Sequence, residues 1–161
     1  GATAYLVARR QPVRVTAGGL TVEVPAAWAR QQQSAEWDLT PLGAAGRRGT
    51  ALVVAGDVAG WRDPASTTPG VFVGVAPGVA ATSLWAASVA RGCPYTEQTR
   101  TLPGGLSGQV RRHDCPGSPT RLTEAVLTRP GSTDLVYVQV KEPVAEDGAA
   151  AVLDSVRAPV S

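Results

Sequence analysis

Residues 120–141 read TRLTEAVLTRPGSTDLVYVQVK, and this stretch decides the fold. Two runs rich in Val, Leu and Thr flank the turn-forming residues PGST at 130–133, a pattern that predicts a β-hairpin. The second run, DLVYVQVK at 134–141, is almost wholly apolar. Because a strand buried on both faces reads as a continuous apolar run, we expect this run to lie deep inside a sheet.

The rest of the chain supplies further strands. Residues 13–24 place Val and Leu on alternate positions about a Gly-Gly turn, which predicts a first hairpin. Polar runs at 96–102 and 106–114 flank a PGG turn, which predicts another hairpin at an edge of the sheet. The remaining strands are predicted at residues 35–41, 50–58 and 71–77, and the apolar run at 50–58 is expected to be central.

Helices are expected between and after these strands. VAATSLWAASVAR at 79–91 has the spacing of a buried helical stripe that includes Leu84, Ser88 and Val89, with Gly92 as its C-terminal cap. A short helix is predicted over residues 26–33, and a final helix buries a face from Ala149 to Val156. Together these elements predict the α+β fold class, with a single, mainly antiparallel sheet flanked by helices.

The composition limits the class of protein. The 161 residues favour one domain, which we assign to residues 11–161. Fifteen basic and thirteen acidic residues leave a net charge of only +2, with no dense basic stripe, so we expect no nucleic-acid partner. Ile, Asn and Met are absent and arginine far outnumbers lysine, which indicates a GC-rich bacterial genome.

Residues 1–10 read GATAYLVARR, a short apolar run closed by two arginines. The run is too short to span a bilayer by itself, since a membrane helix needs roughly 20 apolar residues. Two interpretations stay open, the end of a membrane helix and a first strand. We expect contact with a membrane only through such an N-terminal anchor.

The two cysteines, Cys93 and Cys115, allow three interpretations. A zinc site needs about four ligands, and the two cysteines with His113 match no zinc spacing. A nucleophilic cysteine needs an oriented base, but His113 and Asp114 are adjacent on a predicted strand and point to opposite faces. A disulfide fits best, because both cysteines lie in Pro/Gly-marked loops and no cysteine is left over. It indicates an oxidising compartment and an extracytoplasmic location.

Other residues offer little catalytic chemistry. Ser107 lies in GLSGQ, which lacks the G-x-S-x-G spacing of a nucleophile elbow. We therefore expect no catalytic residues, no metal and no cofactor. The long loop at 59–70 carries Trp61, Arg62 and Asp63, and an exposed Trp beside an Arg can stack a ligand. These three residues are our candidate ligand-binding site, and the alternative is a loop anchored by one Trp.

Three segments of the chain resemble a known family. They are TPGVFVGVAPGVA at 68–80, GCPYTEQTRTLPGGLSGQVRRHDCPG at 92–117 and LVYVQVKEPVAEDGAAAVLDSVR at 135–157. They look like the extracytoplasmic domains of actinobacteria that follow the membrane helix of Ser/Thr protein kinases and occur in related membrane proteins and lipoproteins. LTVEVPAAW at 20–28 is similar to the entry of the Mog1/PsbP-like α/β/α sandwich, the fold that the resemblance implies.

The resemblance implies a function as well. Cys93 and Cys115 correspond to the family's cysteine pair, and no catalytic residue is carried over. The chain is then a non-catalytic extracytoplasmic sensor or interaction domain of a membrane-anchored bacterial protein, with an unknown extracellular ligand or protein partner and an open oligomeric state. The alternatives are a stand-alone secreted or lipid-anchored binding protein, and an extracytoplasmic enzyme with a site around His113 and Asp114.

Overall fold

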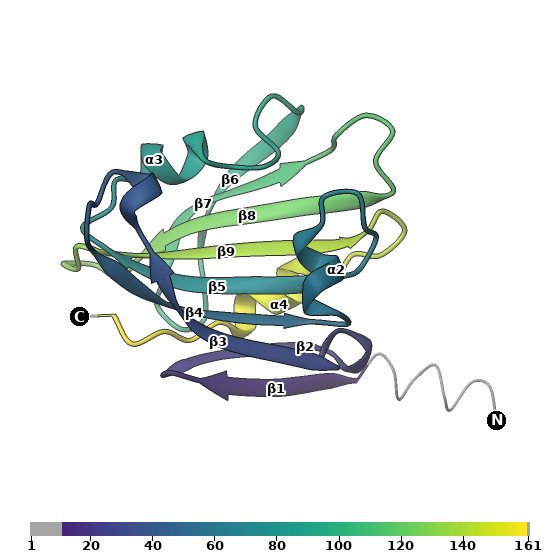
Figure 1. The fold of residues 1–161 in the computed structure, drawn as a ribbon, viewed down its shortest axis with the longest axis horizontal. Helices are drawn as coiled ribbons and strands as arrows, with labels where there is room; N and C mark the ends of the chain where they lie inside the picture. The colour runs from purple at the N-terminus through teal and green to yellow at the C-terminus, as the bar shows by residue number, and fades with distance from the viewer. Residues whose placement is uncertain (1–10, 161) are drawn as a thin grey trace.

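The computed structural model describes residues 11–160, so the N-terminal segment 1–10 and the two interpretations offered for it lie outside the described residues. Its main element is a seven-stranded antiparallel sheet with the strand order β3-β4-β5-β9-β8-β7-β6 (Figure 1). The strands are β3 (Gln31–Asp38), β4 (Arg48–Ala55), β5 (Gly70–Pro77), β6 (Tyr95–Thr101), β7 (Ser107–His113), β8 (Thr120–Thr128) and β9 (Asp134–Pro143). The α+β class and the mainly antiparallel sheet are thereby confirmed.

The hairpin predicted over residues 120–141 forms the middle of this sheet. β9 pairs with β8 on one side and with β5 on the other, so that Val138 lies between Ala125 and Val73. All three side chains are fully buried. The expectation that the DLVYVQVK run lies deep in the sheet is therefore confirmed, as is the edge position of β6.

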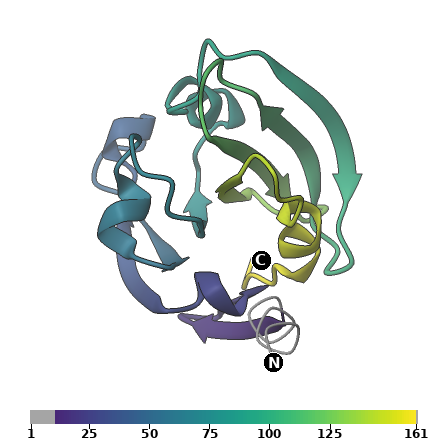
Figure 2. The same ribbon diagram turned by 90° about the vertical axis from the view of Figure 1, so that its right-hand side faces the viewer.

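A two-stranded hairpin, β1 (Pro12–Ala17) with β2 (Leu20–Pro25), stands apart from the main sheet. The expectation of one sheet is corrected here. Leu20, Val22 and Val24 are 0% exposed, because the hairpin lays this apolar face over the main sheet instead of extending it. Beside it lies α4 (Ala149–Ser155) (Figure 2). The Ser155 hydroxyl of α4 accepts a hydrogen bond from the backbone N–H of Glu23 at 2.8 Å.

The opposite face of the sheet carries further short helices. They are η2 (Thr40–Leu42), α2 (Val58–Arg62) and α3 (Ala81–Ala86). Because side chains alternate along a strand, residues 135, 137, 139 and 141 of β9 share this face while Val136, Val138 and Val140 face α4. None of the helices among residues 11–160 is long and apolar enough to cross a bilayer.

Two predicted helices are wrong in extent. The helix expected over 26–33 is a single 3₁₀ turn, η1 (Ala26–Trp28), since Gln31 already pairs with Ala55 of β4. The helix expected over 79–91 ends at Ala86. Beyond Ala86, the Ser88 hydroxyl accepts a hydrogen bond from the backbone N–H of Ala90 in the same loop. It also donates a hydrogen bond to the carboxylate of Glu124 on β8. Such bonds compete with helix continuation.

Candidate functional site

A pocket of about 560 Å³ opens on the sheet face opposite α4. Its floor comes from β3, β4, β5 and β9. Its walls come from α2 with the following loop, from the end of α3 with the loop after it, and from the segment 115–122 that leads into β8. The aromatic side chains of Trp37, Trp61, Phe72 and Tyr137 line it. The pocket is therefore concave, partly open and largely apolar, which is the usual form of a small-molecule site.

Two glycines of β5 make the aromatic floor possible. A Cβ added at Gly74 would lie 2.6 Å from the ring of Trp37, and one added at Gly70 would lie 2.7 Å from Cδ1 of Trp61. The two indoles thus rest directly on the strand, one at each glycine. Between them Phe72 meets Trp37 edge to face, with ring centroids 5.1 Å apart. The GVFVG run of β5 carries this signal, because glycine on one face of a strand leaves room for a close neighbour.

Trp61 and Arg62, two of the three predicted ligand-binding residues, line the pocket. Trp61 is only 9% exposed and packs on Val53 and Ala55, so the expectation of an exposed indole is wrong. The guanidinium of Arg62 donates to Gln33 Oε1 at 2.9 Å. Trp61 therefore anchors its loop and forms a wall of the pocket with the same ring.

The carboxylate of Asp63, the third predicted ligand-binding residue, is engaged within its own loop. Its Oδ1 accepts from the backbone N–H of Ala65 at 2.9 Å. Its backbone oxygen accepts a hydrogen bond at 3.1 Å from the ammonium of Lys141. The structure therefore uses the main chain of Asp63, not the carboxylate, at the edge of the site.

Lys141, which the sequence analysis did not single out, is the lone lysine of the chain and lines the pocket. It is 6% exposed, and its Nζ donates to the backbone oxygens of Asp63 and, at 3.4 Å, of Trp61. Burial lowers the pKa of Lys141, against the opposing charge of Asp63. The sequence signal was its position: Lys141 follows Tyr137 and Gln139 on the same face of an apolar strand.

A buried polar cluster stands behind one wall, centred on Glu124. This carboxylate is 0% exposed, accepts from the hydroxyls of Ser88 and Tyr137, and lies 2.9 Å from Nε2 of His113. Burial would raise the pKa of Glu124, but the bonds from His113, Ser88 and Tyr137 outweigh it and hold that pKa below its ordinary value. Burial and the neighbouring carboxylate raise the pKa of Tyr137. Both oxygens of Glu124 are thus occupied, as suits an anchor for the loop that carries Ser88.

His113 and Asp114 are not brought together. His113 is 3% exposed and faces Glu124, whereas Asp114 is exposed and its carboxylate lies 3.3 Å from Nε of Arg121. The expectation that these neighbours point to opposite sides is confirmed. The pair offers no base with an orienting carboxylate.

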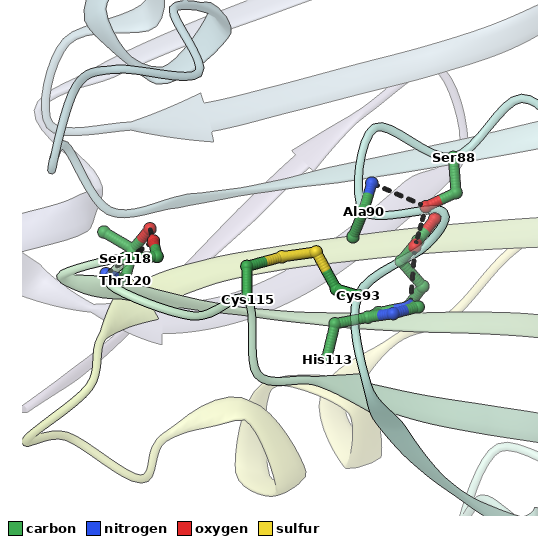
Figure 3. Close-up of a disulfide and its surroundings, with 8 residues drawn as sticks. Ser88, Ala90, Cys93, His113, Cys115, Ser118 and Thr120 are labelled. Carbon is green, nitrogen blue, oxygen red and sulfur yellow. Dashed lines mark hydrogen bonds and ion pairs between the residues drawn. A yellow bond between two sulfur atoms is a disulfide. The ribbon is translucent and has the colours of Figure 1, made fainter.

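The disulfide between Cys93 and Cys115 is present, with Cα atoms 4.9 Å apart and a sequence separation of 22 residues (Figure 3). Figure 3 shows the bridge close to Ser88 and His113, and Cys115 itself lines the pocket. The bridge therefore ties the loop after α3 to the end of β7. The wall is held twice, by this covalent bond and by the hydrogen bond of Ser88 to Glu124.

The geometry defines a cavity with an aromatic floor and a buried lysine, Lys141. Among residues 11–160, no three His, Cys, Asp or Glu side chains gather as a metal site would require. Comparison with known proteins adds no family, because no family model matches the chain and no curated protein matches it.

Proposed function

We propose that this chain is a non-catalytic extracytoplasmic sensor or interaction domain that binds a small extracellular molecule in the pocket. The observation that carries the proposal is the pocket itself, about 560 Å³ over an aromatic floor. Sites for small molecules in proteins usually measure about 300–1,000 Å³ and are lined by apolar and aromatic groups with a few polar ones.

The extracytoplasmic location is supported by the disulfide, since such bonds persist mainly in oxidising compartments. A membrane-anchored parent protein, with a Ser/Thr protein kinase as the leading candidate, rests on the resemblance of three sequence segments. The Mog1/PsbP-like α/β/α sandwich is part of the same proposal, and an antiparallel sheet with helices on both faces is in keeping with it. A stand-alone secreted or lipid-anchored binding protein would use the same pocket.

An extracytoplasmic enzyme is the weaker alternative. It would need a reactive group and a base at one place, and the side chains of His113 and Asp114 point apart. Loss of a hydrolase activity in His113→Ala would favour that alternative.

The binding proposal is tested by a ligand screen on the full 161-residue chain, followed by titration calorimetry with two matched variants. Ala87 is exposed and lines the pocket, whereas its exposed neighbour Ala86 does not line it. We expect Ala87→Trp to weaken binding of the screened ligand at least about tenfold by filling the mouth, and Ala86→Trp to leave affinity unchanged. Equal affinity in the two variants, or a screen without any ligand, would refute the proposal.

The kinase assignment has a separate test in the coding sequence upstream of Gly1. A membrane helix preceded by a kinase-sized cytoplasmic region would support it. A short signal peptide in that place would favour the stand-alone binding protein.

A further inference from the structure

We propose that the pocket takes an amphipathic monocarboxylic acid, with its carboxylate at Lys141 and its apolar body on the aromatic floor. This inference rests on the proposed function and names the ligand class of the same site. It follows from which polar groups in the pocket have partners and which do not.

The ammonium of Lys141 has a donor to spare. A lysine ammonium carries three N–H groups, and two of them meet the backbone oxygens of Trp61 and Asp63. Within residues 11–160, no carboxylate forms an ion pair with Lys141, and the carboxylate of Asp63 is held by the N–H of Ala65. The charge of Asp63 acts on Lys141 from beyond ion-pair distance, and a buried charge without a charged partner in contact is costly. An anion bound in the pocket would supply both the missing acceptor and a counter-charge in direct contact.

A second unpartnered donor lies beside the first. Nε1 of Trp61 is buried and has no hydrogen-bond partner among the described residues. Gly70 of β5 is the cross-strand partner of Lys141 on β9, and Cδ1 of Trp61, the atom bonded to Nε1, sits over Gly70. Directly opposed residues of an antiparallel pair have Cβ positions about 5 Å apart. The indole edge and the Lys141 side chain are therefore neighbours, and each carries an N–H without a partner among the described residues.

The carboxylates around the pocket favour an anionic ligand over a cationic one. Among residues 11–160, Asp38 is the one acidic residue that lines the pocket, and its Oδ1 accepts from the N–H of Thr40 at 3.0 Å. Glu124 behind the wall is fully buried, with both oxygens engaged. A cationic ligand would thus meet the positive charges of Lys141 and Arg62, while one oxygen of Asp38 and both oxygens of Glu124 are already engaged. With one buried cation, a single carboxylate is the matching group, because phosphate sites usually gather several charged donors.

The apolar body of the ligand follows from the rest of β9. Tyr137 lies four residues before Lys141 on the same face, which is roughly 13 Å along a strand. Over that length the floor presents the rings of Phe72, Trp37 and Tyr137, whose centroids lie 5.1–6.1 Å apart. A ligand held by its carboxylate at Lys141 would extend its apolar part over these rings.

The test uses three probes with one shared body: 4-phenylbutyrate, 4-phenylbutyramide and 4-phenylbutylamine. Each is titrated calorimetrically against the wild-type chain, Lys141→Met, Lys141→Arg and, as a control for surface charge, Arg47→Met. We expect the acid to bind about tenfold to a hundredfold more tightly than the amide, as a hydrogen-bonded charge pair would give. Lys141→Met should abolish this preference, whereas Lys141→Arg and Arg47→Met should retain it.

A second measurement does not depend on any variant folding. Because Lys141 is the lone lysine, protein labelled with ¹³C-lysine gives one Cε resonance, which the acid should shift and the amide should not. Equal binding of acid and amide, tighter binding of the amine, no binding of the acid, or an unmoved lysine resonance would overturn the ligand class. If the pocket still binds some neutral or cationic compound in the screen, the proposed function stands although the proposed ligand class is wrong. If nothing binds there, both fail.

Discussion

Substitution of Gly74 by Ala tests whether the aromatic floor depends on an absent side chain. The new Cβ would lie 2.6 and 2.7 Å from two atoms of the Trp37 ring and 2.8 Å from the Phe72 ring. Real Cβ atoms essentially never approach so closely, so both rings must move. Their retreat is limited, because Tyr137 stands 6.1 Å from the centroid of Trp37 and 5.9 Å from that of Phe72.

The expected cost follows from two opposing effects. Overpacking of a filled site costs about 1–3 kcal/mol. Alanine in a strand gains about 0.5–1 kcal/mol over glycine, since the unfolded chain is less free. We therefore expect Gly74→Ala to lower the free energy of unfolding by about 1–2 kcal/mol. It should also weaken the binding of any ligand that lies on the aromatic floor.

Urea unfolding with equal m-values measures this difference. Gly56→Ala is the matched control, because its Cβ would meet its neighbours no closer than 3.4 Å at a glycine without positive φ. It should leave stability unchanged or raise it slightly. If Gly74→Ala is as stable as Gly56→Ala and binds the same ligands, the rings do not rest on the strand as described.

Three further changes probe the wall and the buried cation. Replacing Cys93 and Cys115 by Ala should cost about 3 kcal/mol in chemical unfolding, from the entropy of a 22-residue loop, and unchanged stability would contradict this. Glu124→Gln should lower the free energy of unfolding by about 3 kcal/mol or more, because it breaks a buried cluster. Glu97→Gln, in an exposed ion pair, should lower it by less than about 1 kcal/mol, and similar losses in the two variants would argue that Glu124 does not anchor the Ser88 loop. Burial lowers the pKa of Lys141 from its ordinary value of 10.5, so between the two values the unfolded chain holds more protons and stability should rise with pH. Lys141→Met should remove that rise, and a rise that persists would assign it elsewhere.

The strands of the sheet could be predicted because their signal is local. The β8–β9 hairpin follows from two apolar runs about one turn, whereas its register, with Val138 opposite Ala125, is seen in the structure. The cysteine pair was equally accessible, since two cysteines in turn-marked loops leave few alternatives. The helix ending at Ala86 was not accessible, because the bond that diverts Ser88 reaches Glu124, 36 residues away.

The site shows the same division between local and distant causes. Trp61 was singled out from its loop, but its burial depends on the distant strands: it packs on Val53 and Ala55 of β4, and Gly70 of β5 leaves space for the indole. Lys141 looked like the polar end of a strand, and such residues are usually solvated. Its burial depends on the carbonyls of the α2 turn lying over β9, a contact between segments 78 residues apart.

The two links that hold the pocket wall bear on how a ligand could act. The disulfide and the bond of Ser88 to Glu124 fix the segment after α3 at two points, and the floor is packed on strand glycines. A cavity held in this way exists before its ligand arrives, so little binding free energy is spent on ordering it. Among the described residues of the pocket, Lys141 and Trp61 each keep a hydrogen-bond donor without a partner. A ligand of the proposed class would therefore place its charge beside Lys141, whose ammonium tethers the α2 turn to β9.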